Sequence, residues 1–185
     1  ALVRKPAGLS NCEEYCDWME SSEAEAVLAS APTVVHLAGN LKPAQGDYNS
    51  ANVKTTERVA QSVSPTCCRR FVFLSFHGAS IRSKNPYLAS KAQAENTLLS
   101  AGVPTTILRC CHIVGSPSRP GPTASSLIAG SSGVVQVLGS GSQRWAPIAL
   151  QDVVAAIVAS LAGEHDGRFD LQGPEVMELD ELITV

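Results

Sequence analysis

The run Phe71-Val72-Phe73-Leu74-Ser75 is the strongest strand pattern in this chain. Its residues are aromatic or β-branched for the most part, and these types are enriched in strands. The basic pair Arg69-Arg70 precedes the run, and the residues after Ser75 have the composition of a loop. The segments on either side of this strand therefore decide which kind of sheet it belongs to.

Strand and helix patterns alternate along the rest of the chain. We predict strands at residues 1–4, 33–37, 105–109 and 168–171, with shorter ones at 13–16 and 134–138. Helices are predicted at residues 23–29, 47–63, 85–99 and 150–161, with a short one from Glu178 onward. Pro86 suits the first turn of its helix, where a missing amide costs nothing. This alternation predicts an α/β fold with a largely parallel sheet and helices on both faces.

Length and composition favour one domain that binds a small molecule. The chain has 185 residues, of which 44% are hydrophobic and 17% charged, enough for one buried core. We expect a single domain over residues 1–185, in which residues 115–185 form a smaller substrate-side region. The net charge of -3 argues against nucleic acid held through its phosphates. No apolar run approaches the roughly 20 residues that span a bilayer, and no signal peptide is recognisable, which predicts a cytoplasmic or organelle-matrix location.

The cysteines predict neither a disulfide framework nor a metal site. Cys67-Cys68 and Cys110-Cys111 are adjacent pairs, and neighbouring residues on a strand point to opposite faces. Cys12 and Cys16 are spaced like zinc ligands, yet no second pair of ligands follows them. We therefore expect small buried side chains in most of these positions and no bound metal.

Tyr87 and Lys91 are the pair of residues that points most clearly to chemistry. They lie four residues apart on a predicted helix, so they share one face about one turn apart. A lysine ammonium near a phenol lowers the phenol's pKa, which suits the phenol to acid–base work on a hydroxyl or carbonyl. The alternative is an exposed helical pair with no function.

Several segments, taken together with this pair, resemble the short-chain dehydrogenase/reductases. The likeness is greatest to the atypical branch that includes NmrA-like proteins and an accessory subunit of respiratory complex I. The matching segments follow the family's order: Val34 to Gly39, Asp47 to Thr56, Arg70 to Ser75, Tyr87 to Glu95, Gly102 to Arg109, Gly141 to Val154 and Gly173 to Glu175. The resemblance implies a Rossmann-like, doubly wound sheet that binds NADP or NAD and a small-molecule substrate.

The resemblance also assigns roles to residues. It implies Tyr87, Lys91 and Ser75 as catalytic residues. Cofactor contacts would come from Arg4, Asp17, Leu37, Ala38, Gly39, Phe76, Tyr87, Lys91, Cys111, His112 and Ile113. Arg4 would meet the 2′-phosphate of NADP and Asp17 would lie beside the adenine. A solvated charge at Arg4, and a turn or cap role for Asp17, remain alternatives, and His36 and His112 are expected as packed, neutral histidines.

Two departures from the family pattern change these expectations. We expect the chain to start in the second strand, without the first strand, the glycine-rich turn and the first helix that hold the pyrophosphate. We therefore expect impaired dinucleotide binding in a fragment, a truncated gene product or a swapped oligomer. Phe76 stands where the family places its catalytic serine, and the residues alone do not decide whether Ser75 or Ser80 reaches a substrate.

Two functional hypotheses follow. The first is an NAD(P)-binding atypical short-chain dehydrogenase/reductase that uses Tyr87 and Lys91 as an oxidoreductase or epimerase. The second is a non-catalytic structural or regulatory module that keeps the fold for contact with a partner protein or with copies of itself.

Overall fold

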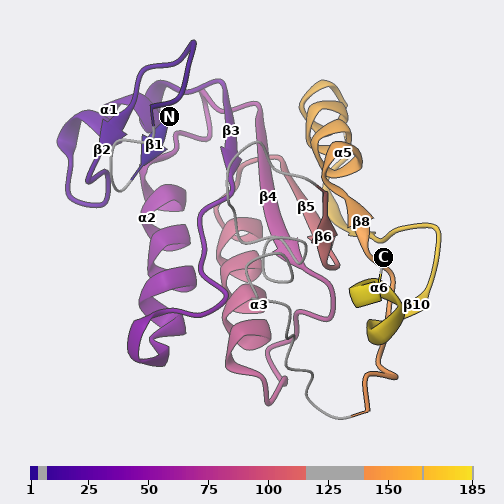
Figure 1. Ribbon diagram of the computed structural model, residues 1–185. Helices are drawn as coiled ribbons and strands as arrows, with labels where there is room; N and C mark the ends of the chain where they lie inside the picture. Colours follow the sequence, from indigo (N-terminus) through magenta and orange to yellow (C-terminus); the bar gives the residue numbers. More distant parts are fainter. Residues whose placement is uncertain (4–7, 116–139, 164, 185) are drawn as a thin grey trace.

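The computed structural model describes residues 1–3, 8–115, 140–163 and 165–184 (Figure 1). Its main sheet contains four parallel strands: β3 (Thr33–His36), β4 (Arg70–Phe76), β5 (Thr105–Cys110) and β9 (Gly167–Leu171). They lie in the order β3-β4-β5-β9. This topology confirms the predicted mostly parallel α/β fold and each of these strands to within two residues.

Helices cover both faces of this sheet, as predicted. The helices α1 (Ser22–Ser30), α2 (Thr55–Ser62) and α3 (Pro86–Leu99) share one core with the sheet, and α5 (Leu150–Ala162) packs on the opposite face (Figure 1). β4 alternates between the two cores. Phe71 and Phe73 pack toward α1–α3, whereas Val72 packs toward α5, and all three are at most 1% exposed. β4 is therefore buried on both faces.

Short polar residues begin two of the helices. The Asn85 side chain accepts a hydrogen bond from the Tyr87 amide at 3.0 Å, and Pro86 follows it in the first turn of α3. The Ser21 hydroxyl accepts from the Ala24 amide at 3.2 Å at the start of α1. These caps place Tyr87 in the first turn of α3.

The segment predicted as one helix at residues 47–63 has a mixed form. A 3₁₀ turn, η1 (Ala44–Gly46), leads to a π-helical stretch, η2 (Asn49–Lys54), which continues into α2. π-Helical turns are uncommon and often occur at functional sites. This one brings the side chain of Asn52 into the interior, where it is 1% exposed.

Several two-residue strands lie outside the main sheet. β1 (Leu2–Val3) pairs in parallel with β2 (Tyr15–Cys16), within the two strands predicted near the N-terminus. β6 (Ile113–Val114) pairs with β8 (Ile148–Ala149), and β7 (Arg144–Trp145) pairs with β10 (Met177–Glu178), ahead of α6 (Leu179–Thr184). The sequence did not predict these last four, because pairs this short have no pattern of their own. The strand predicted at residues 134–138 lies outside the described residues.

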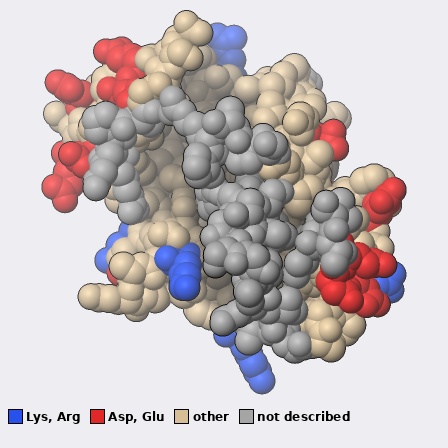
Figure 2. All heavy atoms as spheres, viewed as in Figure 1, with Lys and Arg blue, Asp and Glu red and all other residues tan. Residues whose placement is uncertain are grey.

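The cysteines and charges agree largely with expectation. All six cysteines are free thiols, and Cys68 and Cys110 are each 2% exposed. The expectation of burial is wrong for Cys12 and Cys67, which are exposed. Figure 2 shows acidic side chains gathered around α1 and the C-terminal helix, with lysines and arginines scattered over the viewed face. None of the helices in the described part of the chain has the length and apolar character needed to cross a membrane.

Candidate functional site

The candidate site lies where the strands of the main sheet end. Gly39 follows β3, Phe76 ends β4 and His112 follows β5, while Tyr87 and Lys91 come from the first half of α3. Ligands of open α/β sheets bind at this carboxyl edge of the strands. The fold thus brings the central part of the predicted site to one place.

Lys91 points into the protein from α3. Its ammonium donates a hydrogen bond to the Leu74 carbonyl at 2.8 Å and lies 4.1 Å from the centre of the Phe73 ring. The residue is 4% exposed, and burial lowers the pKa of Lys91 to about 8, against the opposing effect of Glu95. A lysine ammonium carries three donors, and Leu74 takes one of them.

Tyr87 is half-buried among other aromatic rings. Its ring centre lies 5.5 Å from that of Phe76 and 6.4 Å from that of Tyr48. Burial raises the pKa of Tyr87 to about 12, with a smaller contribution from Cys110. The lowered pKa that the sequence predicts for Tyr87 is therefore wrong for the structure. The Lys91 ammonium is directed to a strand carbonyl, and the phenol lies in apolar surroundings that disfavour its anion.

Ser75 and Phe76 lie on opposite faces of β4. The Ser75 hydroxyl donates to Glu95 at 2.6 Å, and Ser75 is 4% exposed. Phe76 faces Tyr87 instead, at the position where the resemblance places a catalytic serine. Ser80 is exposed on the following loop. The Ser75 hydroxyl therefore points into the interior, away from Tyr87 and the rings that contact it.

Glu95 is the centre of a buried, charged cluster that includes Ser75. It is fully buried and accepts hydrogen bonds from Arg109 at 2.9 and 2.6 Å and from Arg168 at 2.8 Å. Arg109 lies on β5, Arg168 on β9 and Ser75 on β4. The cluster therefore joins α3 to three strands of the sheet. With four donors on its two oxygens, the carboxylate is well satisfied in the interior.

Asn52 is a site residue to which sequence reasoning assigned no role. Its side-chain oxygen accepts from the Asn40 amide at 2.8 Å, and its amide nitrogen donates to Ser90 Oγ at 3.0 Å. A Cβ added to Gly39 would lie 2.9 Å from this oxygen and 3.7 Å from Lys91 Nζ, so a larger residue here would displace the Asn52 side chain from its hydrogen bonds. The only signal in the sequence is an amide residue on the apolar side of a predicted helix.

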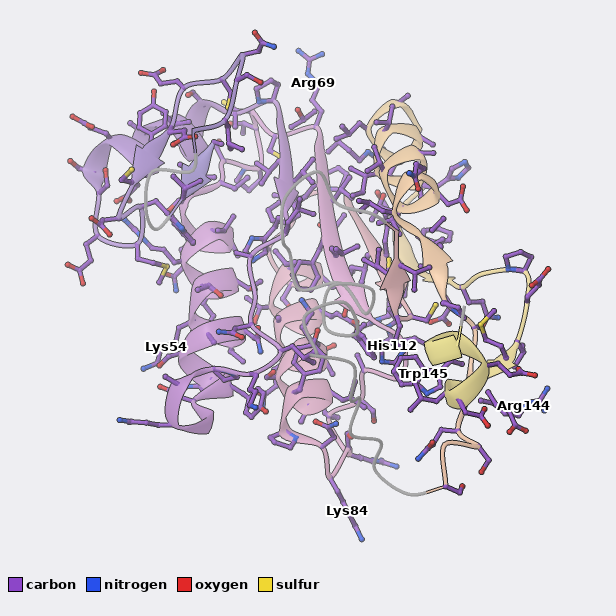
Figure 3. All side chains as sticks on the ribbon, in the orientation of Figure 1. Lys54, Arg69, Lys84, His112, Arg144 and Trp145 are labelled. Atoms are coloured by element: carbon purple, nitrogen blue, oxygen red, sulfur yellow. The ribbon has the colours of Figure 1, made fainter. Side chains whose placement is uncertain are left out.

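The two histidines of the matched segments are packed as expected. His36 is 4% exposed and lies 3.0 Å from Thr56 through Nε2 and Oγ1, and burial, with Lys91 nearby, lowers its pKa to about 3. His112 stacks on Trp145, with ring centres 3.6 Å apart (Figure 3), and burial lowers its pKa as well. Both rings are therefore neutral at pH 7.

Other predicted cofactor residues have varied positions. Arg4 lies outside the described residues. Asp17 is exposed after β2, with a φ of 48°, and its carbonyl accepts from the Glu20 amide at 3.2 Å, which is a turn geometry. Leu37 and Ala38 follow β3, and Leu37 is 56% exposed. The Cys111 thiol contacts the Ala146 carbonyl, and Ile113 belongs to β6.

A family model agrees with this geometry. The model of the NAD dependent epimerase/dehydratase family matches residues 3–171. The chain belongs to this family. The membership confirms the resemblance on which the expected Rossmann-like fold and nicotinamide cofactor depended.

Curated relatives and solved structures extend the comparison. The chain is 29% identical, over 91% of its length, to the mitochondrial NADH dehydrogenase [ubiquinone] 1 alpha subcomplex subunit 9 of Arabidopsis thaliana. It is 23% identical to the mitochondrial NADH-ubiquinone oxidoreductase 40 kDa subunit of Neurospora crassa, over 90% of its length. It spans 43% and 44% of these two proteins.

The solved structures show the same fold in proteins with bound NAD. MoeE5 in complex with UDP-glucuronic acid and NAD superposes with a TM-score of 0.82, at 21% identity, over 99% of this chain and 71% of its own. A UDP-glucuronic acid 4-epimerase from Bacillus cereus in complex with NAD gives a TM-score of 0.81, at 16% identity, over 99% and 72%.

Proposed function

We propose that this chain is part of an NAD- or NADP-binding protein in which Tyr87 and Lys91 hold the nucleotide without catalysing a reaction. The observation that carries the proposal is the position of Lys91. Its ammonium is nearly buried yet lies against Gly39, at the carboxyl edge of the sheet. An ammonium there suits the hydroxyls of a nucleotide ribose, because it offers donors in apolar surroundings.

The residues at this edge fit a dinucleotide. Gly39 lets the Asn52 and Lys91 side chains pack closely against the backbone after β3, and Asn52 links that backbone to α3 through its hydrogen bonds with Asn40 and Ser90. Leu37 and Ala38, together with the backbone of residues 111–113, would border the nucleotide. A bound nicotinamide would supply hydride chemistry. The residues of this chain would supply its binding and orientation.

Binding without turnover follows from the groups around Tyr87. The raised pKa keeps its phenol protonated at pH 7, so the phenol donates a hydrogen bond and is a poor base. Ser75 is bound to Glu95, and Phe76 offers only hydrocarbon in its place. A substrate oxygen would therefore meet the Tyr87 phenol without a serine hydroxyl beside it, so it would be polarised by one group instead of two.

The test uses the full-length protein that contains this chain. Calorimetric titration with NAD and with NADP separates the two nucleotides. Tyr87→Phe is expected to weaken binding by no more than about tenfold, the effect of one hydrogen bond. Steady-state assays should detect no turnover in either protein. Tyr15→Phe, a change on β2 away from the site, is the control.

Two results would contradict the proposal in different ways. If neither nucleotide binds, the site is not a dinucleotide site. If the native protein turns over a substrate and Tyr87→Phe abolishes that turnover, the site binds as proposed but is catalytic.

A second role, contact with a partner protein, is favoured by an exposed part of the sheet. β3 is an edge strand of the main sheet in the described part of the chain. Val35 lies in register with Val72 and so faces the α5 side, where it is 39% exposed. Val154 and Val158, one turn apart on α5, are 51% and 60% exposed. The open edge of β3 is where the first strand of the doubly wound order would lie, so the partner protein that we propose covers Val154 and Val158 of α5, in the matrix of an organelle.

The complex I names of the curated relatives support this role, because those proteins are subunits of an assembly. Val158→Lys in the full-length protein is expected to prevent stable assembly with the partner and to leave nucleotide binding unchanged. Amide hydrogen exchange in α5 should slow on assembly in the native protein only. Val176→Lys, an exposed valine before β10, is the control, and unchanged assembly of Val158→Lys would contradict this role.

A further inference from the structure

Two buried threonines follow the π-helical stretch that carries Asn52. Thr55 and Thr56 begin α2 and are 2% and 0% exposed. The Thr55 hydroxyl lies 3.0 Å from the Ala51 carbonyl oxygen and 3.2 Å from the Asn52 carbonyl oxygen. The Thr56 hydroxyl donates to the Asn52 carbonyl at 2.8 Å. Both hydroxyls are therefore directed to the backbone of η2.

The winding of the helix changes where η2 meets α2. In a π-helix each carbonyl pairs with the amide five residues later, whereas in an α-helix it pairs with the amide four residues later. Two successive carbonyls at such a junction therefore compete for one amide. Threonine hydroxyls can donate to carbonyls one turn earlier in a helix, and here they reach those of Ala51 and Asn52. The hydroxyls thus supply additional donors beside the junction.

The position of the Asn52 side chain depends on this π-helical turn. Its oxygen accepts from the Asn40 amide and its amide group donates to the Ser90 hydroxyl, so one orientation must suit both partners. Each residue of an α-helix advances the chain by about 100° around the helix axis. If the turn became α-helical, the loss of its extra residue would rotate Asn52 by roughly that angle relative to α2, away from both partners.

Thr56 also joins η2 to the end of β3. A hydroxyl carries one proton, and Thr56 gives this proton to the Asn52 carbonyl. The ring of His36, 3.0 Å away, must therefore donate to Thr56 through Nε2. The Thr56 hydroxyl thus lies between the last residue of β3 and the residue that holds the backbone after β3.

We propose that Thr55 and Thr56 are positioning residues of the nucleotide site, which hold the π-helical turn so that Asn52 keeps the backbone after β3 in place. The Lys91 ammonium lies against the same backbone at Gly39. The link to a nucleotide rests on the function proposed above, whereas the effect on Asn52 rests on the hydrogen bonds alone.

Thr55 is the residue to change first, because the Thr56 hydroxyl also pairs with His36. In the full-length protein, Thr55→Val keeps the branched shape but removes the donor, whereas Thr55→Ser keeps the donor. Amide hydrogen exchange at Asn40, relative to the amides of β4, is expected to become about five- to tenfold faster in Thr55→Val, the effect of one weakened hydrogen bond. In Thr55→Ser it should stay at the native rate. Calorimetry should show a matching loss of nucleotide affinity in Thr55→Val only.

Ser62→Ala is the matched control. The Ser62 hydroxyl donates to the Arg58 carbonyl at 2.9 Å within α2, beyond the π-helical turn, so its loss should change neither the Asn40 exchange rate nor nucleotide affinity. Equal acceleration in Ser62→Ala, or a native rate in Thr55→Val, would overturn the proposal. Thr56→Val, compared with Thr56→Ser, repeats the test at the second hydroxyl.

Two further outcomes separate this proposal from the function proposed above. If the native protein binds neither NAD nor NADP, that function fails, and the Asn40 exchange rates alone decide whether the threonines hold Asn52. If Asn40 exchanges faster in Thr55→Val while nucleotide affinity is unchanged, the π-helical turn does not position the nucleotide site.

Discussion

Replacing Glu95 with alanine is expected to lower the free energy of unfolding by about 3 kcal/mol, because two arginines then lose the carboxylate that balances them. Glu95 is fully buried, and the Arg109 and Arg168 side chains are 21% and 36% exposed. Without the carboxylate, the two arginine charges are unpaired, and water solvates them only in part. Ser75 would also lose the acceptor of its hydroxyl. Urea denaturation at pH 7 measures the difference.

The pH dependence of this effect has a definite sign. Burial tends to raise the pKa of Glu95, but the hydrogen bonds from Arg109, Ser75 and Arg168 outweigh it and hold the pKa below its ordinary value. A carboxyl group with a lowered pKa stabilises the fold fully above its unfolded pKa of about 4.3. That stabilisation is lost as the pH falls through the lower, folded value.

The control for Glu95 is an exposed ion pair of the same type. Glu25 pairs with Arg58 at 3.0 Å, and its side chain is 53% exposed. Glu25→Ala is expected to cost no more than about 1 kcal/mol, the usual range of surface pairs. If the two substitutions lower the free energy of unfolding equally, the buried cluster contributes no more to stability than a surface ion pair.

Lys91→Met is expected to stabilise the fold at pH 7 by about 3 kcal/mol, and to weaken nucleotide binding by tenfold or more. The pKa of Lys91 falls from 10.5 to about 8, because burial disfavours the ammonium. The folded protein therefore sustains a cost for keeping this group charged. Methionine fills a similar volume without that cost, but it donates no hydrogen bond to a ligand.

The sign can be checked by titration. A lysine whose pKa is lowered in the folded state costs stability below that pKa, and the cost disappears as the pH rises from about 8 to 10.5. The native protein should therefore approach the stability of Lys91→Met across this window. Its affinity for the nucleotide should decline above about pH 8 as the ammonium deprotonates.

Lys54→Met is the control for Lys91→Met. Lys54 ends η2 and is exposed, as Figure 3 shows, so both stability and nucleotide binding should stay unchanged. A destabilised Lys91→Met protein would mean that contacts of the ammonium with Leu74 and Phe73 outweigh its burial. Unchanged nucleotide affinity would remove Lys91 from the site.

The sequence by itself determined the arrangement of the main elements. Uninterrupted apolar runs such as Phe71 to Leu74 predicted buried strands, and Asn85 with Pro86 predicted where α3 begins. These signals are local, because strand and helix preferences and caps depend on residues a few positions apart. Local signals of the same kind predicted that Tyr87 and Lys91 lie on one helix.

Only the tertiary structure decided what these side chains contact. Glu95 meets Arg109 and Arg168, which are 14 and 73 residues away along the chain, and this cluster takes the Ser75 hydroxyl. The pKa of Tyr87 rises because rings from distant segments surround it, although its neighbour on the helix had predicted a fall. Burial and hydrogen bonding are properties of the packed chain, so the residues that act together are known only once the strands are placed side by side.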